Sequence, residues 1–139
     1  MTSEELGNKT YPTVNDFVEY FKKNPLTDKE RWMLLLNYFS PDNTITSKIM
    51  GAAMGWKIGG SNANLPYGKL AGKIAEQMNY QLPNPNYNVS FLADFPEEAA
   101  IHWRMRPELV EAIHLLNWDT IDAKRKAEDE LSTAEIMLM

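Results

Sequence analysis

The sequence contains no cysteine and only two histidines, and this scarcity excludes several kinds of chemistry. Without cysteine, the 139-residue chain forms no disulfide and offers no thiolate as a nucleophile or a metal ligand. A zinc ion bound by His102 and His114 would need carboxylates for its remaining ligands, which is an unusual set. We therefore expect no metal site and no cofactor.

Long hydrophobic runs are also missing. No apolar stretch approaches the ~20 residues that a membrane-spanning helix requires. The N-terminal residues carry acidic side chains before any apolar stretch, which is the reverse of the order in a secretory signal. The sequence thus predicts a cytoplasmic protein with no membrane-bound segment. Residues 1–11 show no apolar periodicity and are expected to form a flexible N-terminal tail.

Motifs of common catalytic and nucleotide-binding sites are absent as well. The chain has no phosphate-binding loop, and the glycines between residues 51 and 60 do not have dinucleotide-binding spacing. No nucleophile elbow is present. His102 is expected on the exposed face of a strand, and His114 beside the apolar stripe of a helix, where a hydrogen-bonded structural histidine is commoner than a base. We therefore expect a protein that is not an enzyme.

Charge is distributed unevenly along the chain, whose formal net charge is −5. Residues 81–139 have a net charge of −6, whereas residues 46–80 contain four lysines and one acid and have a net charge of +3. A basic segment inside an acidic protein indicates either a polyanion-binding surface or lysines that only solvate helix surfaces. The four lysines are Lys48, Lys57, Lys69 and Lys73.

Apolar residues at helical spacing predict helices over residues 14–23 and 28–39. Thr13 precedes the first helix. Thr27 and Glu30 have the spacing of a capping box at the start of the second helix. A shorter helix is expected within residues 44–56, with Gly55 at its C-terminal end.

A longer helix is expected to begin between residues 62 and 65 and to end near residue 78. Pro66 is tolerated there only in the first turn, where its missing N–H has no partner to lose. Leu70 and Ile74 belong to the buried stripe, while the lysines fall on the opposite side. Ser61, Asn62 and Asn64 are candidate N-caps of this helix.

The last third of the chain alternates between strand and helix patterns. Apolar residues alternate over 88–95 and again over 101–106, which predicts a β-hairpin with one buried face. A helix follows from Pro107. Residues 119–139 are helix-prone but weakly amphipathic, and we expect them to form a C-terminal helical tail that packs on the domain or on a second copy.

This order of elements predicts a mainly α protein with a small β-hairpin, an α+β fold of the winged helix-turn-helix type spanning residues 12–118. In such folds the second helix of the pair enters the major groove of double-stranded DNA. Side chains at its start suit that role, because asparagine forms bidentate contacts with adenine, and serine, tyrosine and lysine bind phosphates. The candidate DNA-binding residues are Lys57, Ser61, Asn62, Asn64, Tyr67, Lys69, Lys73 and Arg104.

Each candidate also has a purely structural interpretation. Serine and asparagine before a helix are commonly caps, and Tyr67 could pack its ring in the core. Glu97 and Glu98 argue against a hairpin tip that contacts phosphates. The helix therefore supports DNA binding better than the hairpin does.

The pattern from Thr27 to Trp118 resembles a segment found at the N-terminus of bacterial HNH-type restriction proteins. The most specific part is Asn64-Leu65-Pro66-Tyr67-Gly68-Lys69-Leu70, which is similar to a run in that segment. The resemblance implies a winged-helix-like DNA-recognition module linked to restriction or to defence against mobile elements. The chain has no HNH constellation, so nuclease activity is not implied.

Two other interpretations stay open. The acidic C-terminal portion and the apolar residues 136–139 suggest a protein-interaction module, or an inhibitor of a nucleic-acid enzyme, that retains the winged-helix scaffold. Residues 119–139 could also form a homodimer, which would pair two recognition helices on a palindromic site.

Overall fold

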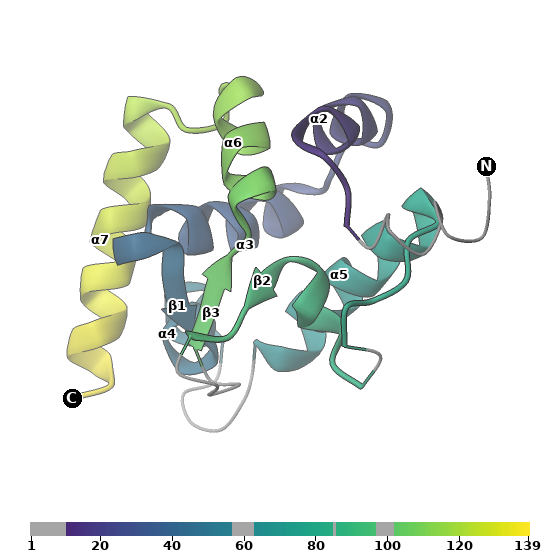
Figure 1. The fold of residues 1–139 in the computed structure, drawn as a ribbon. Coiled ribbons are helices and arrows are strands. Elements are labelled where there is room, and N and C mark those ends of the chain that lie inside the picture. The colour runs from purple at the N-terminus through teal and green to yellow at the C-terminus, as the bar shows by residue number, and fades with distance from the viewer. Residues whose placement is uncertain (1–10, 57–62, 85, 97–101) are drawn as a thin grey trace.

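The computed structural model describes residues 11–56, 63–84, 86–96 and 102–139. In these residues the chain is mainly α-helical with one small antiparallel sheet, as Figure 1 shows, so the α+β class is confirmed. The expected hairpin consists of β2 (Ala93–Asp94) and β3 (His102–Met105). A strand that the sequence analysis missed, β1 (Thr44–Thr46), lies on the other side of β3, which gives the order β1-β3-β2.

Helices α2 (Val14–Lys23) and α3 (Asp28–Phe39) have the expected bounds. Each begins with a capping box in which a threonine hydroxyl accepts a hydrogen bond from the N3 backbone N–H and the N3 carboxylate accepts one from the threonine N–H. The box of α3 joins Thr27 to Glu30, as the sequence predicted. Both helices direct apolar side chains into one core, where Phe17, Leu34 and Leu36 are fully buried.

The next two helices are α4 (Ser47–Ala53) and α5 (Asn64–Met78). Thr46 caps α4 through its hydroxyl, and Gly55 follows the helix with φ +78°, a left-handed conformation that glycine adopts without a steric cost. The start of α5 at Asn64 lies within the expected range.

The segment before the hairpin differs from the prediction. Residues 88–91 form a 3₁₀ helix, η2 (Asn88–Phe91), and only Ala93 and Asp94 are strand. The prediction of a strand over 88–95 is wrong because burial does not alternate there: Ser90 and Leu92 are as buried as their apolar neighbours. The segment is enclosed by the core, and η2 packs along α5.

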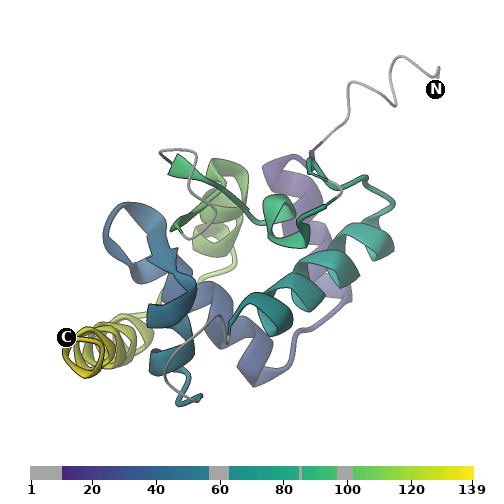
Figure 2. The same cartoon turned by 90° about the horizontal axis from the view of Figure 1, so that it is seen from below.

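The last two helices are α6 (Pro107–Leu115) and α7 (Ile121–Met137). Helix α6 packs against α2, and α7 packs against α3 and α4, with Ala127 and Leu131 in the core. In Figure 2 α7 (yellow) lies on one side of the molecule and α5 (teal) on the other. The C-terminal helical segment thus packs back on the domain, one of the two arrangements that the sequence allowed.

Candidate functional site

Helix α5 has one face in the core and one face open to solvent. Its buried side chains include Tyr67, Leu70 and Ile74, which follow the helical repeat. The opposite side, which we call the α5 outward face, consists of the exposed residues Leu65, Lys69, Lys73, Glu76 and Gln77. Leu65 is a large apolar residue with 66% of its surface exposed.

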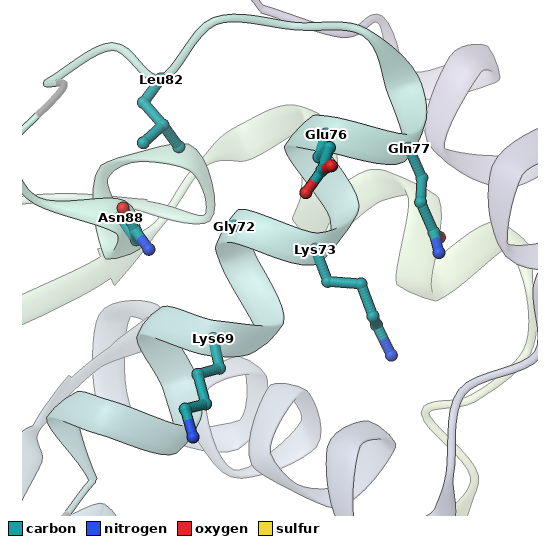
Figure 3. Close-up of a pocket in the computed structure, with 7 residues that line it drawn as sticks. All are labelled: Lys69, Gly72, Lys73, Glu76, Gln77, Leu82 and Asn88. Atoms are coloured by element: carbon teal, nitrogen blue, oxygen red, sulfur yellow. The ribbon is translucent and has the colours of Figure 1, made fainter.

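A groove runs between α5 and the segment that follows it. Figure 3 shows Gly72 between Lys69 and Lys73 on the helix, with Asn88 across the groove. A smaller hollow that also includes Lys69 and Asn88 extends the groove toward Asn64 at the start of α5. The groove has a volume of about 730 Å³ and is lined by Lys69, Gly72, Lys73, Glu76, Gln77, Leu82 and Asn88.

Two glycines on α5 allow the close approach of η2, and they should respond differently to alanine. A Cβ at Gly68 would lie 3.8 Å from Asn88 Cβ, an ordinary contact, whereas one at Gly72 would lie 3.0 Å from Asn88 Nδ2. Because alanine favours a helix over glycine, Gly68→Ala should stabilise the fold by about 0.5–1 kcal/mol. Gly72→Ala should gain less, because it must displace the Asn88 amide. Urea unfolding measures both changes, and a destabilising Gly68→Ala would contradict the described packing.

The two lysines of the outward face have different surroundings. Lys73 forms an ion pair with Glu30 at the start of α3. Burial alone would raise the pKa of Glu30, but hydrogen bonds from Lys73 and Thr27 outweigh it and hold that pKa below its ordinary value. Lys69 is exposed and forms no ion pair with any residue that the structure describes. Lys69 is therefore the cation of this face most available to a ligand.

Arg104 lies on β3, outside the α5 groove. Its guanidinium donates two hydrogen bonds to its cross-strand neighbour Asp94, with Nε–Oδ1 at 3.0 Å and Nη2–Oδ2 at 2.9 Å. Such a bidentate pair is geometrically specific and offsets the charge of the arginine. Of the described candidates, Asn64, Lys69 and Lys73 lie together along α5, whereas Arg104 does not join them.

Tyr67 requires a correction. Its side chain is fully buried, and its ring stacks on Trp103 with the ring centroids 5.2 Å apart. The hydroxyl donates to Asn37 Oδ1 over 2.8 Å, and Asn37 Nδ2 donates to the carbonyl oxygens of Trp103 and Asn43 over 3.0 and 2.9 Å. The prediction that Tyr67 contacts DNA is wrong, because both its ring and its hydroxyl are used inside the fold. Tyr67 instead fixes α5 to α3 and to the sheet.

Of the remaining candidate DNA-binding residues, Asn64 alone lies in the described part of the chain. Asn64 is the first residue of α5, half-buried, and lines the hollow that continues the α5 groove. The N-cap position belongs to Ala63, so Asn64 does not cap the helix with its side chain. Lys57, Ser61 and Asn62 lie outside the residues that the structure describes.

The polar residues around this site that sequence patterns do not single out include Glu30, Gln77 and Asn88. The sequence predicts Glu30 only as part of a capping box, and its pairing with Lys73 spans 43 positions, for which no spacing rule exists. The sequence predicts Asn88 at the start of a strand, whereas the residue begins η2. Gln77 follows Lys69 and Lys73 at helical spacing, and that repeat was the one available signal.

His114 lies in a polar cluster away from α5. Its Nδ1 and the Tyr38 hydroxyl both bind Asp119 Oδ2 at 2.8 Å, which joins α6 and α3 to the start of α7. The hydrogen bond with Asp119, and then its charge, raise the pKa of His114 above its ordinary value. Burial would raise the pKa of Asp119, but hydrogen bonds from His114 and Tyr38 outweigh it and lower that pKa overall. Burial, together with the hydrogen bond to Asp119 and its charge, raises the pKa of Tyr38 to about 12.

These shifts predict how stability depends on pH. A histidine with a raised folded pKa stabilises the fold fully below its unfolded pKa of about 6.5, and this contribution is lost as the pH rises through the folded value. The urea midpoint should therefore decrease on going from pH 6 to pH 8.5, and His114→Gln should reduce that decrease. An unchanged pH dependence in His114→Gln would refute the assignment.

Comparisons with known proteins add no identification. No protein-family model, curated protein or solved structure matches the chain. In the described residues no group of three or more His, Asp or Glu side chains is placed to hold a metal ion. No helix within these residues has the length and apolar character needed to cross a membrane. The candidate site therefore depends on the geometry of α5 alone.

Proposed function

We propose that this chain is a non-catalytic DNA-binding domain of the winged-helix type, with α5 as its recognition helix. The observation that carries the proposal is the topology around α5. Helix α3, strand β1, helices α4 and α5, and strands β2 and β3 follow one another, with β1 beside β3. We interpret this order as that of a winged-helix domain, in which the α5 outward face, exposed among the described residues, would enter the major groove.

The chemistry of the α5 outward face supports the same proposal. Lys69, which forms no ion pair among the described residues, offers its ammonium to a phosphate, and Asn64 carries an amide of the kind that reads adenine. Gln77 carries the same kind of amide, but its Oε1 already accepts a hydrogen bond from the Tyr20 hydroxyl. Leu65 offers an apolar contact of the type made with the thymine methyl group. Few of these groups are charged, so we expect modest affinity. If the resemblance to restriction proteins holds, the DNA would belong to a restriction or defence system.

The hairpin contributes less to the proposal. Arg104 already has a carboxylate partner in Asp94, and the acidic residues Glu97 and Glu98 follow β2 in the sequence. A phosphate bound at Arg104 would compete with a fixed bidentate contact. Arg104 therefore stays a weaker candidate than Lys69.

A titration of the whole protein against a fluorescent 20-base-pair duplex of mixed sequence tests the proposal. We expect binding at 50 mM salt that weakens on going to 200 mM, with a slope of log K against log salt between about −1 and −3 for one to three phosphate contacts. No detectable binding at 50 mM would reject DNA as the partner.

A protein partner is the second candidate, and the surroundings of Lys73 favour it. Glu30 and Glu76 balance the two lysines of the α5 outward face, which leaves a nearly neutral, mixed-charge surface with Leu65 exposed. A nearly neutral surface with an exposed apolar side chain is more typical of a protein-binding site than of a phosphate-binding site. Exposed Ile136 and Met139 also leave a homodimer through the end of α7 open to a test by sedimentation.

A further inference from the structure

Lys73 has an acidic partner supplied by a distant part of the chain. Its ammonium binds Glu30 Oε2, and the two side chains retain 41% and 20% exposure. The contact is thus open to water and to ions on one side. A phosphate that approached the α5 outward face would meet Lys73 already engaged.

Glu30 is held at this position by the start of its own helix. Its Oε1 accepts a hydrogen bond from the Thr27 N–H over 3.0 Å, and its own N–H donates to Thr27 Oγ1 over 3.1 Å. This capping box fixes the carboxylate, so the second oxygen remains directed to Lys73 without a further loss of side-chain freedom. Glu30 is therefore a stationary negative charge at the edge of the α5 outward face.

We propose that Glu30 sets the DNA affinity of the α5 outward face by competing with phosphate for Lys73. This inference rests on the function proposed above. For Lys73 to bind a phosphate it must leave Glu30, which then stands unpaired near a second anion. DNA binding thus gains less from Lys73 than from Lys69, which forms no ion pair within the described part of the chain.

The variant Glu30→Gln separates the two roles of Glu30. Glutamine serves at N3 of a capping box as glutamate does, so the start of α3 is retained while the charge is removed. Affinity for the 20-base-pair duplex at 50 mM salt should rise about three- to tenfold, and the salt slope should become steeper by about one. Glu128→Gln, the same change at an exposed position on α7, is the matched control and should alter affinity little.

A second background distinguishes competition from a general effect of charge. When Glu30→Gln is added to the Lys73→Ala variant, DNA affinity should increase only slightly, because no Lys73 ammonium is left to be released from Glu30. An equal increase in DNA affinity with Lys73 present and with Lys73 replaced would contradict the proposal that Glu30 and phosphate compete for Lys73. Unchanged affinity of Glu30→Gln, with unfolding by urea showing an intact fold and the wild-type chain binding DNA, would overturn the inference alone. Absence of binding by every variant would overturn both the inference and the proposed function.

Discussion

Asn37→Ala should lower the free energy of unfolding by about 3–5 kcal/mol, the largest effect that we expect from a single polar substitution in this chain. The Asn37 side chain is fully buried and satisfies the Tyr67 hydroxyl and the carbonyl oxygens of Trp103 and Asn43. Alanine would leave the buried Tyr67 hydroxyl and Trp103 carbonyl, and the part-buried Asn43 carbonyl, without that partner. Each buried group left unpaired costs about 1–3 kcal/mol before relaxation, and the substitution would also add a cavity. Urea unfolding followed by tryptophan fluorescence measures the change.

Two further variants help to interpret the loss of stability expected for Asn37→Ala. Tyr67→Phe removes one hydrogen bond of the same network and keeps the ring stacked on Trp103, so it should cost about 1–2 kcal/mol. Asn15→Ala, on the exposed side of α2, should change stability by less than about 0.5 kcal/mol. A loss below about 1 kcal/mol in Asn37→Ala would mean that the network does not hold α5 in place.

Lys69→Glu should weaken binding of the 20-base-pair duplex about ten- to a hundredfold at 50 mM salt. It replaces with an anion the lysine of the α5 outward face that has no ion pair in the described part of the chain. Lys69 is exposed, so the substitution should leave the fold intact. The expected signature is a salt slope reduced by about one together with an unchanged urea midpoint. Fluorescence anisotropy over a salt series measures both the affinity and the slope.

The matched control is Lys124→Glu, an identical change at an exposed position of α7. Helix α7 lies on the other side of the molecule from α5 in Figure 2. The two variants have the same net charge, so a comparison of their DNA affinities separates the effect of the position from the effect of total charge. If the two variants lose the same affinity, the loss reflects overall charge and not a site on α5. If neither loses affinity, the DNA interface lies elsewhere.

Local signals predicted most of the helices. The capping box of Thr27 and Glu30, the proline in the first turn of α5 and the turn at Gly55 are contacts within a few residues, so the sequence alone specifies them. Alternation over residues 101–106 also predicted the buried face of β3, on which Trp103 and Met105 lie.

Features that depend on distant parts of the chain were not predictable in this way. Strand β1 has three residues and forms only because β3 lies beside it. The hydroxyl of Tyr67 finds its partner on α3, and Glu30 meets Lys73 across two helices. The candidate site changed for the same reason: sequence periodicity placed Lys69 and Lys73 on one side of α5, but only packing showed which side chains are already engaged.

Amide chemical-shift mapping of the isotope-labelled chain, titrated with the 20-base-pair duplex at 50 mM salt, tests the central claim most directly. We expect the largest shifts at Leu65, Lys69, Lys73 and Gln77, with little change along α7. Large shifts on α7, and none on the outward face of α5, would contradict the assignment of α5 as the DNA-binding helix.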